Sequence, residues 1–233
     1  MTNAAPRQSQ TAVPEPLARI AELMSTFRPD WFLCGGWAAD SWLGSQTRSH
    51  GDVDITAFHD DQRALFDHLA GWELIGHDDN VADDSPEPWT GRTLDLPAHV
   101  HAHSRDGFNL EIILNDRTDG DWIFNRQPPI TLPLERCTRE SAWGLPTVTP
   151  EVILFYKAHP PAWRDTSPPA LRPHDELDLL ALLPHLTRQQ RNWLCAAIAL
   201  VDPGHPWLPR LAQDDAAEGT QDHDQDHDTD GER

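Results

Sequence analysis

Residues 31–56 read WFLCGGWAADSWLGSQTRSHGDVDIT, and this stretch decides our prediction of the fold. Its first four residues form an apolar run of strand length that ends at Gly35-Gly36, where the missing side chains let the backbone approach a ligand closely. Residues 37–43 then predict a short helix that is closed by Gly44. Backbone N–H groups and the helix dipole favour an anion beside the glycines, so the pattern indicates a phosphate site.

The end of the same stretch carries two carboxylates at strand spacing. Asp52 and Asp54 alternate with Val53 and Ile55, so a strand would place both carboxylates on one face and both aliphatic side chains in the core. Two neighbouring carboxylates favour a hard cation such as Mg²⁺, which can in turn hold substrate phosphates. Either motif alone is weak evidence, because Gly-Gly turns and solvated Asp-x-Asp pairs are common.

The order of the motifs resembles the polymerase-β-like nucleotidyltransferases. It is most similar to the branch of aminoglycoside 2''-nucleotidyltransferases and lincosamide nucleotidyltransferases. The resemblance covers about residues 31–207 and implies that Gly35 and Gly36 contact the triphosphate, while Asp52 and Asp54 bind magnesium. It rests on Gly-Gly-Trp-Ala-x-Asp, then Leu-Gly, then Arg48-x-His50-x-Asp52-x-Asp54.

Three polar residues lie between the two halves of this pattern. Arg48 and His50 have two interpretations, since they could shape the entrance to the strand or touch phosphate. Asp40 lies in the predicted helix, where it could bond to loop backbone, and we interpret it as structural. Of the three, we include Arg48 among the expected nucleotide-binding residues.

A third carboxylate is expected from a later strand. In residues 108–114 the even-numbered positions are apolar and form one face, which leaves Glu111 on the other face. On its own, Glu111 could simply face water. The resemblance implies a third carboxylate here that assists metal binding or accepts the proton of the attacking hydroxyl, and Asp95 is the alternative candidate.

Three histidines alternate on the preceding predicted strand. His99, His101 and His103 could in principle bind zinc from one face, but we favour structural or solvent-facing roles. Residues 104–107 predict a turn into the strand of Glu111, forming a hairpin. Whether the histidines share the face of Glu111 depends on the register of that hairpin, which the sequence does not determine.

The C-terminal third predicts a small helical domain. Thr149-Pro150 is a typical helix start, and the helix that follows carries Lys157, the single lysine of the chain. An isolated lysine is usually solvated, whereas the resemblance implies that Lys157 reaches the triphosphate. Residues 174–178 resemble a family segment that usually begins with lysine, and because His174 replaces that lysine we assign no phosphate contact there.

Apolar periodicity predicts further helices and the domain limits. One apolar stripe runs from Leu17 to Phe27, another includes Leu177 and Leu180, and Thr187 caps a later helix. We expect an α+β fold with a mixed sheet. Its parts are a disordered N-terminus (1–14), a nucleotidyltransferase domain (15–148), a helical domain (149–212) and an acidic disordered tail (213–233).

The charge balance bears on the partners. The net charge of the 233 residues is −20, of which residues 214–233 contribute −8 and the rest −12. An acidic surface repels nucleic acid and concentrates cationic small molecules. Bound magnesium would offset the negative charge of the protein and so allow an NTP to bind. Residues 78–88 are also acidic and are either a solvated loop or a rim that receives a cationic acceptor.

Cellular context follows from two sequence features. The chain has no apolar run near membrane-spanning length, and residues 1–10 lack the hydrophobic segment of a signal peptide. Cys34, Cys137 and Cys195 fit neither a disulfide framework nor a zinc ribbon. We therefore expect reduced thiols, a cytoplasmic location and no membrane partner.

These observations together predict an enzyme that uses Mg²⁺ and ATP or another NTP. It would transfer a nucleoside monophosphate to a hydroxyl of a cationic small molecule, such as an aminoglycoside or lincosamide antibiotic, and release pyrophosphate. Two alternatives remain at this point, namely a nucleotidyltransferase acting on protein or RNA and a non-catalytic nucleotide- or cation-binding module of the same fold. The sequence assigns no oligomeric state.

Overall fold

The computed structural model describes residues 12–78, 87–124, 130–159 and 171–213. Most of the predicted N-terminal segment 1–14, most of the acidic loop 78–88 and the tail from residue 214 onward lie outside these ranges. The predictions made for those segments therefore stay predictions.

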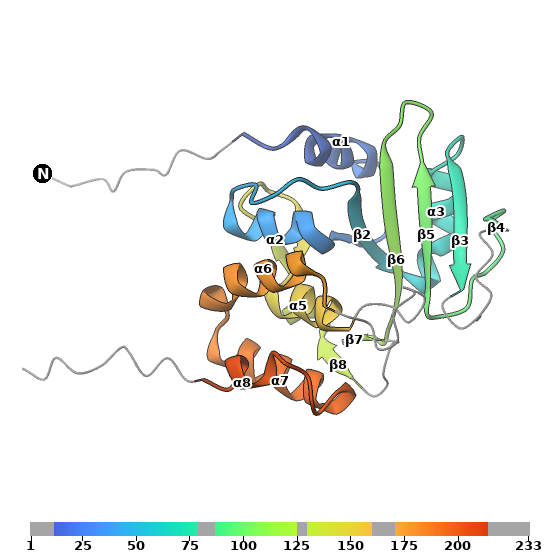
Figure 1. The fold of residues 1–233 in the computed structure, drawn as a ribbon. Coiled ribbons are helices and arrows are strands. Elements are labelled where there is room, and N and C mark those ends of the chain that lie inside the picture. The colour runs from blue at the N-terminus through green and yellow to red at the C-terminus, as the bar shows by residue number, and fades with distance from the viewer. Residues whose placement is uncertain (1–11, 79–86, 125–129, 160–170, 214–233) are drawn as a thin grey trace, which may run out of the picture.

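Within the described residues, ten strands form one mixed sheet (Figure 1). Eight of them follow the order β4-β3-β5-β6-β2-β1-β10-β9, and β7 and β8 extend from β6. The pairs β2–β6 and β1–β10 are parallel, whereas the hairpin pairs are antiparallel. The strands are β1 (Trp31–Leu33), β2 (Val53–Phe58), β3 (Glu73–Asp78), β4 (Glu87–Pro88), β5 (Ala98–His103), β6 (Asn109–Arg117), β7 (Asp121–Ile123), β8 (Thr131–Pro133), β9 (Thr138–Glu140) and β10 (Pro146–Val148).

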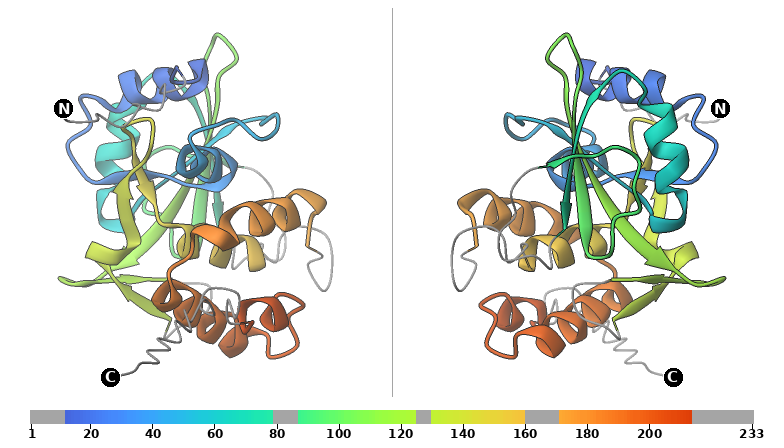
Figure 2. Two further views of the ribbon diagram at one scale, coloured as in Figure 1. Left: turned by 90° about the vertical axis from the view of Figure 1, so that its left-hand side faces the viewer. Right: turned by 90° about the vertical axis from the view of Figure 1, so that its right-hand side faces the viewer.

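Helices flank the sheet, and those from the C-terminal part of the chain pack together. Helices α2, α5 and α6 pack against one another beside the central strands, and α7 and α8 follow below them, as the orange and red ribbons of Figure 2 show. The described helices are α1 (Glu15–Met24), α2 (Gly35–Leu43), α3 (Gln62–His68), α4 (Leu134–Cys137), α5 (Pro150–Ala158), α6 (Pro173–Leu182), α7 (Arg188–Val201) and α8 (Leu208–Leu211).

The opening stretch folds as a strand, a helix and a strand. The apolar run becomes β1, the helix α2 starts at the two glycines, and Asp52 directly precedes β2. Gly44 ends α2 with φ of 67°, a left-handed conformation that glycine adopts without the steric cost of a Cβ. This local order brings the glycines and the aspartates to the same edge of the sheet.

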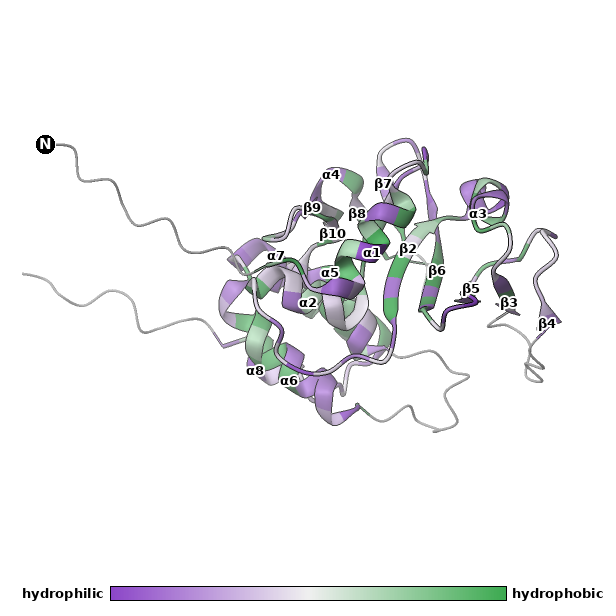
Figure 3. Ribbon diagram, turned by 90° about the horizontal axis from the view of Figure 1, so that it is seen from above, coloured by the Kyte–Doolittle hydropathy of each residue, from purple (hydrophilic) through white to green (hydrophobic). Residues whose placement is uncertain are grey.

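The sheet has one apolar face and one polar face. Alternate side chains of β2 and β6, such as Ile55 and Ile112, are fully buried in the core. The predicted first helix packs its stripe there through Leu17 and Ile20. Figure 3 accordingly shows β2 and β6 as largely green, with purple bands where polar residues alternate. The polar face, opposite this core, is the one that carries Asp54.

The register of the hairpin settles the question of the histidines. In the antiparallel pair of β5 and β6, His101 is opposite Glu111, and His99 is opposite Ile113. Directly opposed residues of a sheet point to the same face. His99, His101 and His103 therefore share the face of Glu111.

The prediction for α6 was wrong about which face packs. Leu177 and Leu180 are 59% and 53% exposed, whereas Asp175, Asp178 and Leu179 are buried. Buried carboxylates are tolerated because basic side chains pair with them, so ion pairs decide this interface. In the next helix, Thr187 accepts a hydrogen bond from the Gln190 backbone, which confirms its predicted role as the cap of α7.

The mixed sheet with flanking helices confirms the predicted α+β class. A single cluster of buried apolar residues runs from α1 through the sheet to α8. The division into domains at residues 148 and 149 stays a prediction. Cys34, Cys137 and Cys195 are all free thiols. No helix among the described residues is long and apolar enough to cross a bilayer.

Candidate active site

Three carboxylates converge at the edge of the central strands. Asp54 lies on β2 directly opposite Glu111 of the parallel strand β6, and Asp52 lies immediately before β2, two residues from Asp54. One carboxylate oxygen from each residue lies within 4.8 Å of the others. Asp95, the alternative third carboxylate, is exposed and does not line this site. The geometry suits a hard divalent cation with oxygen ligands.

The two glycines lie where a side chain would block the site. Gly35 has φ of 65°, and a Cβ there would overlap the Asp54 carboxylate and lie 2.8 Å from Asp54 Cβ. A Cβ at Gly36 would lie 2.6 Å from His50 Nδ1 and would also meet the Arg48 guanidinium. The backbone of α2 can therefore lie close to the Asp54 carboxylate and to the basic side chains of Arg48 and His50, because neither glycine has a side chain.

Asp40 anchors His50, a contact that the sequence analysis missed. Asp40 is fully buried on α2, and its Oδ2 lies 2.6 Å from His50 Nε2. Its Oδ1 accepts bonds from the Thr47 hydroxyl at 2.5 Å and the Thr47 backbone at 3.1 Å. Burial raises the pKa of Asp40, but the hydrogen bonds from His50 and Thr47 outweigh burial and hold the pKa below its usual value.

The imidazole of His50 is consequently fixed on both sides. It packs against Trp37 with ring centroids 4.4 Å apart, and Asp40 occupies Nε2. Because an ionised carboxylate only accepts hydrogen bonds, Nε2 carries the proton, and Nδ1 is directed toward Gly36. Asp40 bonds to loop backbone, as expected of a structural residue, and in addition orients a side chain of the site.

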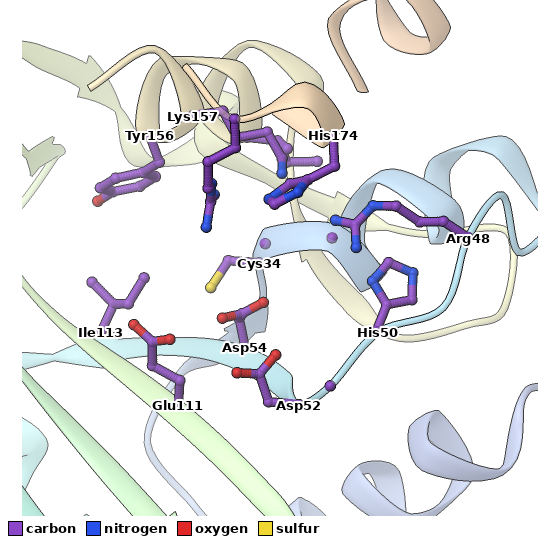
Figure 4. Close-up of a pocket in the computed structure, with 15 residues that line it drawn as sticks. Cys34, Arg48, His50, Asp52, Asp54, Glu111, Ile113, Tyr156, Lys157 and His174 are labelled. Carbon is purple, nitrogen blue, oxygen red and sulfur yellow. The ribbon is translucent and has the colours of Figure 1, made fainter. Parts of the chain in front are cut away.

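A basic wall faces the three carboxylates across a cavity of about 260 Å³ (Figure 4). Helix α5 supplies Lys157, the loop before β2 supplies Arg48, and the start of α6 supplies Arg172 and His174. The lining residues include Cys34, Gly35, Gly36, Arg48, His50, Asp52, Asp54, Glu111, Ile113, Tyr156, Lys157, Arg172 and His174. The predicted catalytic and nucleotide-binding residues therefore line one pocket.

Lys157 is buried among carboxylates of α6 rather than solvated. Its Nζ lies 2.6 Å from Asp178 and 3.2 Å from Asp175. Arg48 Nη2 lies 3.4 Å from Asp178, and Arg172 Nε lies 2.7 Å from Asp175. Three cationic side chains share two carboxylates, so the wall keeps a formal charge of +1.

The aspartates of α6 were not predicted as part of the site. Burial raises the pKa of Asp175, but the bonds from Arg172 and the charge of Lys157 outweigh it and lower the pKa overall. Asp175 therefore stays ionised and holds both basic side chains in place. The two aspartates of residues 174–178 were a sequence signal for this arrangement, but their pairs with Lys157 and Arg48 join distant parts of the chain.

His174 and Cys34 also lie at the cavity. Burial lowers the pKa of His174, and the neighbouring Arg172 charge lowers it further, so the ring is mainly neutral at pH 7. Burial, together with the charges of Asp54 and Glu111, raises the pKa of Cys34 well above its usual value. A thiol with so high a pKa is a poor nucleophile, which argues against cysteine chemistry here.

Helix α5 is tied to the sheet beneath it by a chain of hydrogen bonds. Tyr156 donates to Asn115 of β6, whose amide donates to the hydroxyl of Thr56 on β2. This chain fixes the helix that carries Lys157 relative to the strands that carry Asp54 and Glu111. The two walls of the cavity are thereby held in a defined relation.

Comparison with known proteins agrees with this geometry. The sequence model of the aminoglycoside-2''-adenylyltransferase family matches residues 16–127, which include the glycines and all three carboxylates. The chain is a nucleotidyltransferase that is similar to this family over the matched residues. The match confirms the predicted branch, and no curated protein sequence matched the nucleotidyltransferase.

Two solved structures share the fold of the nucleotidyltransferase. The lincosamide antibiotic adenylyltransferase LnuA, in a lincomycin-bound crystal structure, is 17% identical with a TM-score of 0.50, covering 74% of this chain and 97% of LnuA. The solution structure of the antibiotic-resistance factor ANT(2'')-Ia is 18% identical with a TM-score of 0.51, covering 80% of this chain and 91% of that one.

Proposed function

We propose that the enzyme transfers a nucleoside monophosphate from an NTP to a hydroxyl of a small cationic acceptor and releases pyrophosphate. The observation that carries the proposal is the pairing of the two cavity walls. Three carboxylates lie on the sheet, and glycine backbone with a net-positive cluster lies opposite. Such a site can hold a cation and a polyphosphate side by side, as nucleotidyl transfer requires.

The donor side is assigned to the glycines and the basic wall. Gly35 and Gly36 would present backbone to the triphosphate, and Arg48 and Lys157 would bind its negative charge. Lys157 forms ion pairs with Asp175 and Asp178. On binding the triphosphate, its ammonium group would give up part of these contacts and pair with phosphate oxygens instead. Arginine suits phosphate because its planar guanidinium donates two parallel hydrogen bonds.

The carboxylates fit magnesium by donor type and spacing. Asp52, Asp54 and Glu111 offer only oxygen ligands, which is the set that Mg²⁺ prefers, and Gly35 leaves open the space beside Asp54. When bound, magnesium would neutralise charge at the α-phosphate and favour the ionised form of the acceptor hydroxyl. The three carboxylates would position it against the donor phosphates.

Glu111 has two roles to distinguish. It is 9% exposed and opposite Asp54, so it could either ligate magnesium or accept the proton of the acceptor hydroxyl. Glu111→Gln would raise the magnesium concentration needed for half-maximal activity in the first case. In the second case kcat would fall while the magnesium dependence stayed unchanged.

Charge and the matched family both support the proposed acceptor class. Outside residues 214–233 the chain carries a net charge of −12, which concentrates cations near the surface. Lincomycin is bound in LnuA, and the matched family is named for aminoglycoside 2''-adenylylation. We therefore propose an aminoglycoside or lincosamide acceptor, with ATP as the first donor to test.

We further propose that residues 15–148 and 149–212 act as separate domains with the site between them. The cavity is lined from both parts, by Asp54 from the first and by Lys157 from the second.

The three free thiols fit a reducing compartment, and we place the enzyme in the cytoplasm.

Pyrophosphate release tests the proposed reaction. The enzyme would be incubated with Mg²⁺, each of the four NTPs and a panel of aminoglycosides and lincosamides. We expect release that requires both an antibiotic and the metal, and that is absent in Asp54→Asn. Asp60→Asn is the matched control, since Asp60 is an exposed carboxylate near the end of the same strand. Equal release by Asp54→Asn would refute the site assignment.

A further inference from the structure

A second cluster of ligating side chains lies on the polar face of the sheet, outside the cavity. His77 of β3 is directly opposite His99 of β5, and His101 follows two residues later on β5. Direct opposition and a spacing of two both preserve the face of a sheet, so the three imidazoles project together. The sequence indicated only the alternating histidines of β5, and β3 supplies the additional one.

The three rings are in mutual contact. The centroids are 4.4 Å apart for His77 and His99, 4.6 Å for His77 and His101, and 5.0 Å for His99 and His101. One ring nitrogen from each residue lies within 4.8 Å of the others. His77 and His99 are 9% and 3% exposed, and their Nε2 atoms are shielded from solvent.

The fourth histidine of this face does not join the cluster. His103 is partly exposed near the end of β5, and its Nδ1 lies 2.9 Å from the Asn109 side chain. Its ring centroid is 6.4 Å from that of His101. It therefore provides an internal control, with the same residue type, strand and face but a different environment.

We propose that His77, His99 and His101 bind a divalent transition metal ion such as Zn²⁺. Three neutral imidazoles with an open fourth position form a well-known ligand set for zinc, whereas carboxylates favour magnesium. Zinc–nitrogen bonds of about 2.0–2.1 Å in a tetrahedral site place ligand nitrogens about 3.3 Å apart. Spacings up to 4.8 Å therefore close by roughly 1.5 Å on binding.

Ring rotation can supply this closure. The rings of His77 and His99 are parallel, with an angle of 2° between their planes, so their in-plane lone pairs do not yet meet at one point. His101 is already tilted, at 58° to His77 and 60° to His99. Rotation about the Cβ–Cγ bond is broad for histidine, and tilting one stacked ring directs all three nitrogens to a common ion.

The proposed site is distinct from the carboxylate site but close to it. The two ligand sets share no residue, and the histidines do not line the cavity. His101 is nevertheless opposite Glu111 across the β5–β6 pair. The ligand types would determine which metal binds at each site, because imidazole nitrogens favour zinc and carboxylate oxygens favour magnesium.

Zinc binding to the full-length chain tests this proposal. Equilibrium dialysis against Zn²⁺ would be run with excess Mg²⁺, so that the carboxylates are occupied. We expect one tightly bound zinc per chain in the wild type. His77→Gln and His101→Gln should each raise the dissociation constant at least about 100-fold, since losing a direct ligand should cost no less than the 10–100-fold typical of losing a partner that orients one. His103→Gln should bind like the wild type.

A second control removes the histidines of the acidic tail. The sequence has His223 and His227 among aspartates, and these histidines could bind zinc adventitiously. A variant with both replaced by alanine should still bind one zinc ion tightly. Loss of that tightly bound zinc in the tail variant, or unchanged zinc binding in His77→Gln and His101→Gln, would overturn the proposal.

X-ray absorption of the zinc-loaded wild type keeps the test independent of variant folding. We expect the outer-shell scattering of three imidazole rings around the bound zinc. A spectrum without imidazole scattering would contradict the assignment even if every histidine variant failed to fold.

Discussion

Gly35→Ala, compared with a control at Gly44, distinguishes an effect on catalytic activity from an effect on folding stability. The added Cβ would lie 2.8 Å from Asp54 Cβ and overlap the carboxylate. Carbon atoms in contact are normally about 3.5–4.0 Å apart, so Asp54 or the start of α2 must move by roughly 1 Å. A displacement of that size in a reacting geometry can reduce the rate about 100-fold, or about 2.7 kcal/mol.

Backbone strain adds a separate cost, and Gly44→Ala is the matched control for it. Gly35 and Gly44 have φ of 65° and 67°, so alanine costs roughly 1–2 kcal/mol of stability at either position. Among the described residues, a Cβ at Gly44 would meet Ala142 Cβ at 3.4 Å, and no site carboxylate lies within 4 Å of it. Each kcal/mol lowers the Tm of a chain of this length by about 2–4 °C.

The assay combines thermal unfolding with kcat/KM from pyrophosphate release. Both variants should lose the stability that backbone strain costs, and Gly35→Ala should lose more because its Cβ also overlaps Asp54. Only Gly35→Ala should lose about two orders of magnitude in kcat/KM. If the activity of Gly35→Ala equals that of Gly44→Ala, the close approach of α2 to Asp54 plays no part in the reaction, and our description of the site is wrong.

Three further predictions concern the metal ligands, the tail and pH. Asp54→Asn should abolish transfer with little change in Tm, and unaltered turnover would refute the metal assignment. Deleting residues 214–233 should leave kcat/KM roughly unchanged; a large loss would give the tail a role in the reaction. Burial raises the pKa of Glu151, which means that the folded state binds this proton more tightly than the unfolded state does. The stability that the protonated side chain contributes is therefore lost as pH rises through the raised pKa. Glu151→Gln should therefore raise Tm at pH 7.5, since its amide oxygen can still accept from Gln190, and the gain should fade below about pH 4, where both states bind the proton. An equal or lower Tm at pH 7.5 would contradict this.

Local features of the fold could be predicted because their causes are local. The apolar run, the glycines and the alternation around Asp54 set β1, α2 and β2 within one short stretch. Glu111 could be placed on the polar face of its strand by periodicity alone. Its position opposite Asp54 required the pairing of β2 with β6, which is a nonlocal property.

Other features could not be obtained from periodicity. Leu177 and Leu180 suggested the buried face of α6, but ion pairs of Asp175 and Asp178 with basic side chains outweighed them. Helical spacing cannot reveal such pairs, because Lys157 comes from another helix. The joining of His77 to the histidines of β5 likewise depends on strand register.

The central claim is that this cavity transfers a nucleoside monophosphate, and the fate of the α-phosphate tests it most directly. The enzyme would be given Mg²⁺, an aminoglycoside or lincosamide that supports pyrophosphate release, and NTP labelled at either the α- or the γ-phosphate. Our account predicts that the acceptor gains the α-label, with the mass of one nucleoside monophosphate, while the γ-label leaves in pyrophosphate. Transfer of the γ-label to the acceptor would contradict it.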